Sequence, residues 1–136
     1  MIFVAKMLVA FAILMVSTLG MAASIKAPIP DANTFTPAHV GEMTYYDPSE
    51  SGNEVACGGH YLPTDRIAAL GAGSFGSRAA CGKTAIISLN GNTTTATIVD
   101  MCDAGAPDDI DVTPVVFEDL APTPSGRVPG VAWQMS

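Results

Sequence analysis

The stretch Ile98–Phe117, IVDMCDAGAPDDIDVTPVVF, indicates how the chain folds back on itself. A β-rich run ends at Asp100, a short loop with glycine and proline follows, and a second aspartate, Asp111, stands between two apolar residues. Thr113-Pro114 then has the residue types of a helix N-cap and first helical position. Because side chains alternate along a strand, Asp111 points outward if its two apolar neighbours point into the core. The stretch therefore predicts two carboxylates at the ends of neighbouring elements.

Short β-rich runs make up most of the compact part of the chain. Asn90-Gly91 joins two of them and is a strong hairpin signal, because both residue types tolerate positive φ. The predicted helix runs to about Leu120 and is ended by Pro122 and Pro124. The predicted strands are Glu42–Tyr46, Arg66–Leu70, Thr84–Leu89, Thr93–Val99 and Val128–Gln134, with a loop or one helical turn at Ala72–Ser77. Trp133 is expected in the core. The pattern indicates a mainly β fold, a small six-stranded barrel with one short α-helix.

The N-terminal residues have the three-part pattern of a secretory signal peptide. Lys6 precedes the apolar run Met7–Leu19, and the small residues Ala22 and Ala23 follow, so residues 1–23 are expected to be cleaved. The apolar run is shorter than the ~20 residues that span a bilayer; an uncleaved anchor is the alternative. Residues 24–40 are rich in Pro, Ala and Thr and are expected to be a flexible segment. The domain is predicted at 41–136.

Charge and cysteine content restrict the possible partners. The chain has a net charge of −7, with 6 Lys and Arg against 13 Asp and Glu, which argues against nucleic acid and anionic membranes as partners. We expect a secreted, extracellular monomer.

Secretion would place its three cysteines in an oxidising compartment, and the odd number leaves one thiol unpaired. No zinc spacing or calcium loop is present, so no metal or other cofactor is expected. His39 and His60 are isolated and are expected to be ordinary surface residues.

Six segments resemble the rare lipoprotein A-like double-psi β-barrel family in order and spacing. This family includes barwin, expansin catalytic-type domains, loosenins and family-45 endoglucanases. The matching segments are GEMTYYD (Gly41–Asp47), ACG (Ala56–Gly58), ACGK (Ala80–Lys83), IVDMC (Ile98–Cys102), DIDVTPVVF (Asp109–Phe117) and SGRVPGVAW (Ser125–Trp133). The resemblance is nearest to small secreted fungal proteins with this domain alone. It implies a six-stranded double-psi β-barrel.

The resemblance also implies a cysteine pattern, with departures. It pairs Cys57 with Cys81 in a disulfide and leaves Cys102 as a free thiol. Fungal relatives usually carry another cysteine three residues later, where this chain has Gly105. Bacterial expansins have a sugar-contacting tyrosine at the position of Cys102. Plant expansins and the endoglucanases have a His-Phe pair before the acid, where this chain has Asp109-Ile110.

The same resemblance implies a carbohydrate site. Asp111 matches the general acid of the family, or the aspartate needed for wall loosening, and partial burial near other carboxylates raises the pKa of such a group. Asp47 matches the base of the family-45 endoglucanases. The expected substrate-binding residues are Thr44, Tyr45, Tyr46, Asp100 and Asp109. The alternatives are structural: Asp111 as a solvated acid, Asp100 as an acceptor of backbone N–H groups, the tyrosines as packing residues and Asp47 as a turn residue.

Three functions remain open from the sequence. The first is a secreted expansin- or loosenin-like protein that binds cell-wall polysaccharide, of cellulose or chitin type, in a shallow groove and disrupts its packing without hydrolysis. The second is a family-45-type endoglucanase, with Asp47 as base and Asp111 as acid. The third is a barwin-like effector or protease inhibitor that grips a partner through loops such as Ser49–Pro63. Separately, Asn92-Thr93-Thr94 on the hairpin turn is an N-glycosylation sequon.

Overall fold

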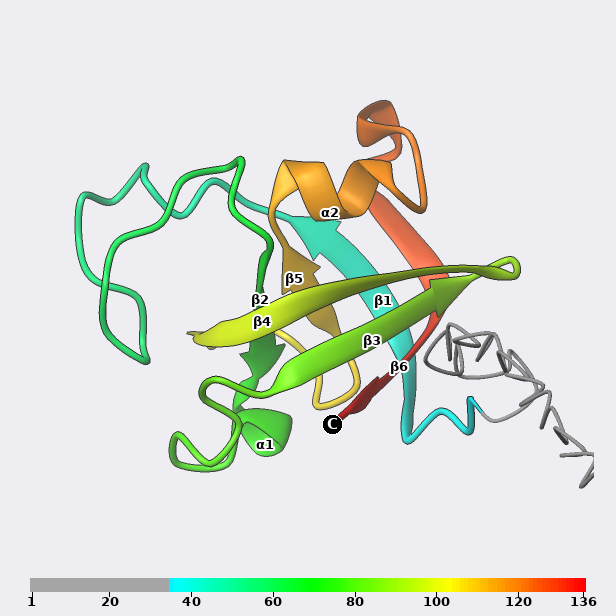
Figure 1. Cartoon of the computed structure of the whole chain (residues 1–136), viewed down its shortest axis with the longest axis horizontal. Coiled ribbons are helices and arrows are strands. Elements are labelled where there is room, and N and C mark those ends of the chain that lie inside the picture. Colours follow the sequence, from blue (N-terminus) through cyan, green and yellow to red (C-terminus); the bar gives the residue numbers. More distant parts are fainter. Residues whose placement is uncertain (1–34) are drawn as a thin grey trace, which may run out of the picture. The chain divides into compact units, whose positions relative to one another are not determined.

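The computed structural model describes residues 35–136, in which six strands close into a barrel in the order β1-β5-β2-β4-β3-β6 (Figure 1). This confirms the prediction of a mainly β, six-stranded barrel. The strands are β1 (His39–Tyr45), β2 (Ile67–Gly71), β3 (Thr84–Leu89), β4 (Asn92–Cys102), β5 (Ile110–Val112) and β6 (Arg127–Met135). The helices are α1 (Ala72–Phe75), α2 (Pro114–Glu118) and the 3-10 turn η2 (Thr123–Ser125).

The predicted signal peptide and most of the predicted flexible segment lie outside the described residues. β1 begins at His39, two residues before the predicted domain boundary at 41, because His39 pairs with Trp133 of β6. In residues 35–136, no helix is both long enough and apolar enough to cross a membrane.

The barrel closes because the short strand β5 lies between β1 and β2. It pairs in parallel with β1 and antiparallel with β2, while β2 in turn pairs in parallel with β4. Inward-facing side chains from these strands form the core, together with α2 and the fully buried Trp133, whose core position was predicted. The main inward side chains of β1, β2 and β5 are Met43, Ala68, Leu70, Ile110 and Val112.

Local features of the sequence explain several connections. Asn90 and Gly91 both have positive φ, 51° and 83°, as the predicted hairpin between β3 and β4 requires. The disulfide Cys57–Cys81 ties the long loop after β1 to the segment after α1, and among the described cysteines Cys102 is unpaired. The predicted Cys57–Cys81 disulfide is confirmed. A loop of this length contributes roughly 3–4 kcal/mol to stability on a chain-entropy estimate.

Two local expectations need correction. Thr113 is the N-cap residue of α2, as predicted, but its hydroxyl donates to the carbonyl of Asp65 and does not accept a helix N–H group. His39 is not isolated: its ring stacks on Trp133 with centroids 4.0 Å apart, and its Nδ1 lies 2.8 Å from Oδ1 of Asp108. In both cases a partner far away in sequence decides the contact, so the local pattern gave no signal of it.

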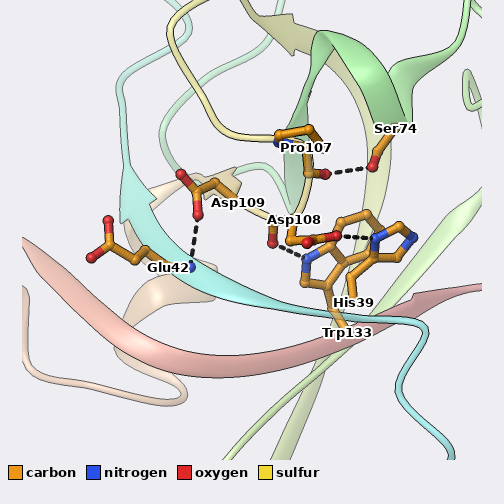
Figure 2. Close-up of polar contacts among 7 residues, drawn as sticks. All are labelled: His39, Glu42, Ser74, Pro107, Asp108, Asp109 and Trp133. Carbon is orange, nitrogen blue, oxygen red and sulfur yellow. Dashed lines mark hydrogen bonds and ion pairs between the residues drawn. The ribbon is translucent and has the colours of Figure 1, made fainter.

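The loop before β5, residues 103–109, lies against β1 and β2 with very little space. A Cβ atom built on Gly41 would lie 2.2 Å from the carbonyl oxygen of Asp108, and one built on Gly71 would lie 2.3 Å from that of Ala106. Figure 2 shows how this loop is held: the indole Nε1 of Trp133 donates to the Asp108 carbonyl at 2.8 Å, and Ser74 donates to Pro107. Only glycine fits at the two strand positions.

Gly71→Ala is therefore expected to destabilise the barrel by about 2 kcal/mol or more, because the added methyl group forces the loop away from β2. The measurement is urea unfolding of the oxidised protein. Gly105→Ala is the matched control, because its Cβ would meet only ordinary contacts of 3.5 Å or more. Equal stability of the two variants would contradict the account of loop packing.

Candidate functional site

A row of residues in register crosses five adjacent strands of the barrel. Thr44 pairs with Arg127 on one side and with Asp111 on the other; Ala69 pairs with both Asp111 and Asp100. Directly paired residues present their side chains on the same face of a sheet. We call these five residues the cross-strand row. At an inter-strand spacing of about 4.8 Å, the row extends over roughly 19 Å.

Asp111 faces outward because of strand alternation, as predicted. Its neighbours Ile110 and Val112 are 1% and 0% exposed and belong to the core. The side chain between them therefore points out of the barrel, where it is half-buried. The register that buries two apolar side chains also delivers this carboxylate to the surface.

Asp100 reaches the same row through a β-bulge. Ala68 pairs with Ile98, but the next residue, Ala69, pairs with Asp100, so that Val99 is an extra residue in β4. Val99 packs with Val55 and Ile67 beneath the loop that follows β1. Bulges of this kind redirect the following side chain, and here the result is that Asp100 and Asp111 lie on either side of Ala69.

Asp111 lies in an open pocket of about 280 Å³. The hydroxyl of Thr44 donates to its Oδ1 at 2.9 Å. Burial raises the pKa of Asp111 above its usual value of 3.8; the Thr44 hydrogen bond opposes this rise, the charge of Asp100 adds to it and that of Arg127 opposes it. The pocket is lined by Glu42, Thr44, Cys102, Ala104, Gly105, Asp109, Ile110, Asp111 and Arg127.

Asp100 is held by three hydrogen bonds. Its Oδ1 accepts the backbone N–H groups of Ala56 and Met101, both at 2.9 Å, and its Oδ2 accepts the hydroxyl of Tyr46 at 3.1 Å. Burial, followed by the nearby charge of Asp100, raises the pKa of Tyr46 well above its usual range, so this phenol stays protonated. Asp100 thus has the backbone-accepting role that was one of its two expected roles, and it also fixes the Tyr46 ring.

The remaining predicted residues have varied positions. Tyr45 is 37% exposed and its ring packs edge-on against Phe117, with centroids 4.9 Å apart. Asp109 lines the pocket, but its two carboxylate oxygens accept backbone N–H groups of Glu42 and Ala106. Asp109 therefore shapes the loop around the pocket.

Asp47 lies apart from the pocket that contains Asp111. Its Oδ1 accepts the N–H and the hydroxyl of Ser49, at 2.9 and 2.6 Å, as in an ordinary aspartate turn. It lines a second pocket of about 290 Å³ together with Tyr46 and Asp100. The structure thus places the bonded pairs Thr44–Asp111 and Tyr46–Asp100 on either side of Ala69. Asp47 lines only the second pocket, next to Tyr46 and Asp100.

Two charged residues of the pocket, Glu42 and Arg127, were not predicted from the sequence. Arg127 forms an ion pair with Glu42, and both line the pocket beside Asp111. Only the pairing of β6 with β1 brings Arg127 opposite Thr44, so no local signal indicated it. In the part of the chain that the structure covers, no group of His, Cys, Asp and Glu side chains is arranged to hold a metal ion. The pocket instead offers hydrogen-bond donors and acceptors side by side.

The sequence was compared with protein-family models and with curated proteins. No protein-family model matches the chain. The allergen Asp f 7 of Aspergillus fumigatus is 39% identical over 99 residues, which cover 69% of this chain and 35% of that protein, so the chain spans about a third of the length of this curated relative.

Two kinds of solved structure share the fold. The Streptomyces papain inhibitor has a TM-score of 0.61 and 26% identity, covering 71% of this chain and 91% of the inhibitor. An expansin of Clavibacter michiganensis, in a structure with cellohexaose, has a TM-score of 0.62 and 20% identity, covering 72% of this chain and 50% of the expansin. The expansin without ligand gives 0.62 and 22%, with the same coverage.

The raised pKa of Asp111 predicts a pH-dependent stability difference. A carboxyl whose pKa is higher in the folded than in the unfolded state loses stabilisation as the pH rises from about 3.8 through the folded value. Asp111→Asn removes this loss and keeps an oxygen that accepts the Thr44 bond. The melting temperature of the variant is therefore expected to exceed that of the wild type at pH 7 and to match it near pH 3.

Glu118→Gln, at an exposed position on α2, is the control for the removal of one negative charge. An Asp111→Asn variant that melts below the wild type at pH 7, by a margin that grows with pH, would contradict the assignment of the raised pKa.

Proposed function

Because the chain belongs to the rare lipoprotein A-like double-psi β-barrel family, which includes the expansins, we propose that it is a secreted protein that binds cell-wall polysaccharide. In this proposal the sugar chain lies along the cross-strand row and its packing against neighbouring chains is loosened without cleavage. Asp111 is the central polar contact, assisted by Thr44 and Tyr46.

The observation that carries the proposal is the Thr44–Asp111 pair at the surface of an open pocket. Sugar hydroxyls both donate and accept hydrogen bonds, so a site for them needs both kinds of partner. Asp111 supplies acceptor oxygens, Thr44 holds one of them, and Arg127 supplies donors on the same row. A carboxylate that is already half-buried has less hydration to lose on binding and makes strong charge-assisted bonds.

The contacts of the other carboxylates favour binding without hydrolysis. An inverting glycosidase needs a second carboxylate free to activate a water on the opposite side of the scissile bond. Asp47 is engaged by Ser49, and Asp100 by two backbone N–H groups and Tyr46. Asp111 therefore acts in this proposal as a hydrogen-bond partner that competes with contacts between polysaccharide chains.

The nature of the polymer follows from charge. The described acidic residues make a polyanionic wall polymer a poor ligand, whereas uncharged chains of cellulose or chitin type have no such penalty. The solved expansin structure that contains cellohexaose supports the cellulose type. The Cys57–Cys81 disulfide fits a secreted protein in an oxidising compartment. No cofactor is required by this role.

Asp111→Asn is expected to weaken binding to insoluble cellulose or chitin by roughly 10- to 100-fold, which corresponds to the loss of one charge-assisted hydrogen bond of about 1.5–3 kcal/mol. Thr44→Val, which keeps the shape of the side chain and removes its hydroxyl, is expected to give a smaller loss. Depletion of the protein from solution over a range of polymer concentrations measures both.

Glu118→Gln serves again as the control, because it removes an exposed carboxylate away from the pocket and should leave binding unchanged. Full binding by Asp111→Asn would remove this residue from the site. Release of reducing ends from soluble glucan by the wild type, abolished in Asp47→Asn, would favour the endoglucanase function instead.

A second function is favoured by a different surface. The loop after β1 contains a small pocket of about 160 Å³ lined by Pro48, His60, Tyr61 and Leu62 among others, and Leu62 is 58% exposed. The papain inhibitor of the same fold makes a protease-binding role the alternative. Inhibition of papain that is lost in Leu62→Asp and kept in Asp111→Asn would support that role; absence of inhibition at micromolar protein would exclude papain as its target.

A further inference from the structure

The turn between β3 and β4 carries a modification sequence that the polysaccharide site does not use. Asn92-Thr93-Thr94 is the only Asn-x-Ser/Thr sequence in the 136 residues, and no proline interrupts it. Asn92 is exposed and is the first residue of β4, next to the turn at Asn90-Gly91. Figure 1 shows this turn at the free end of the β3–β4 hairpin, projecting past the neighbouring strands.

We infer that Asn92 carries an N-linked oligosaccharide, attached during secretion and before the barrel closes. The inference rests on the secretion that is part of the proposed function. The donor is a lipid-linked oligosaccharide diphosphate. Nδ2 of Asn92 forms a bond to the anomeric carbon of the sugar, the bond from this carbon to the diphosphate breaks, Nδ2 gives up one proton, and the lipid diphosphate leaves with the electron pair.

The timing follows from the contacts of Thr94. Its side chain is 7% exposed in the folded barrel. Its hydroxyl donates to Oδ2 of Asp119 at 2.6 Å and accepts from the guanidinium of Arg66 at 2.5 Å. The hydroxyl residue of the sequon is thus engaged by the end of α2 and the start of β2. An enzyme that recognises this residue reaches it only before these elements dock on β4.

Asp119 keeps the Thr94 hydroxyl engaged in the folded barrel. Hydrogen bonds from Thr94 and Arg66 lower the pKa of Asp119, so it stays charged and holds both partners. Folding therefore buries the threonine of the sequon, Thr94, and leaves its asparagine, Asn92, exposed at the surface. Asn92 and Thr94 are two residues apart and face the same side of β4, but Asn92 is exposed at the start of the strand beside the turn, so the attached sugar stays outside this network.

The modified residue lies far from the candidate binding site. Asn92 begins β4 and Cys102, which lines the pocket with Asp111, ends it. Ten residue steps of about 3.3 Å place them roughly 30 Å apart along the strand. The oligosaccharide therefore lies at the hairpin end of the barrel and leaves the pocket that contains Asp111 uncovered.

The test is secretion of the full chain from yeast, followed by mass spectrometry of the protein in the medium before and after treatment with an N-glycosidase. The wild type is expected to lose the mass of one oligosaccharide on treatment. Asn92→Gln is expected to have no glycosidase-sensitive mass, while Thr94→Ser keeps the sequon and is modified. Asp119→Ala, which removes the acceptor of the Thr94 hydroxyl and leaves the sequon intact, is expected to be modified as fully as the wild type, because modification precedes the formation of this contact.

The outcomes separate this inference from the proposed function. Secreted wild type with unmodified Asn92 overturns the inference and leaves secretion and polysaccharide binding standing. Wild type retained in the cell without a sugar overturns both the inference and the proposed secretion. Higher modification of Asp119→Ala than of the wild type would show that the folded contact of Thr94 limits the reaction, and would overturn the order of events. Equal polysaccharide binding before and after glycosidase treatment supports the placement of the sugar away from the row.

Discussion

The structure depends on the insertion of three residues, Ile110–Val112, between β1 and β2. β5 pairs with both neighbours, and without it the sheet does not close. Burying an isoleucine and a valine contributes about 1.5–3 kcal/mol each. A register shift of one residue would expose both and bury the Asp111 carboxylate without a charged partner, which costs several kcal/mol more. The register of β5 therefore determines both the packing of the core and the outward position of Asp111.

A second constraint comes from the loop that leads into β5. It lies so close to β1 and β2 that side chains are excluded at Gly41 and Gly71. The same loop forms one wall of the pocket through Ala104, Gly105 and Asp109. Asp109 is held to the backbone of β1, and Asp108 to Trp133 and His39. One wall of the pocket is thus backbone held firmly in place. Such a preorganised site loses little conformational entropy when a ligand binds.

The sequence predicted what depends on local periodicity. The apolar-acid-apolar pattern around Asp111 indicated its outward direction, Asn90-Gly91 indicated the hairpin, and Pro114 marked the start of α2. It did not predict the β-bulge at Val99, the place of Arg127 opposite Thr44, or the stacking of His39 on Trp133. Each of these depends on which strands become neighbours, and that is decided by barrel closure rather than by residues nearby in the chain.

The central claim is that sugar chains lie along the cross-strand row. The most direct measurement is an NMR titration of the backbone amides with soluble cello- and chito-oligosaccharides. The account predicts that the largest shifts fall on the row and its pocket, at Thr44, Cys102, Asp111 and Arg127, with small shifts at the Asn90-Gly91 turn. Shifts confined to the loop of residues 49–62, or none at millimolar oligosaccharide, would contradict it.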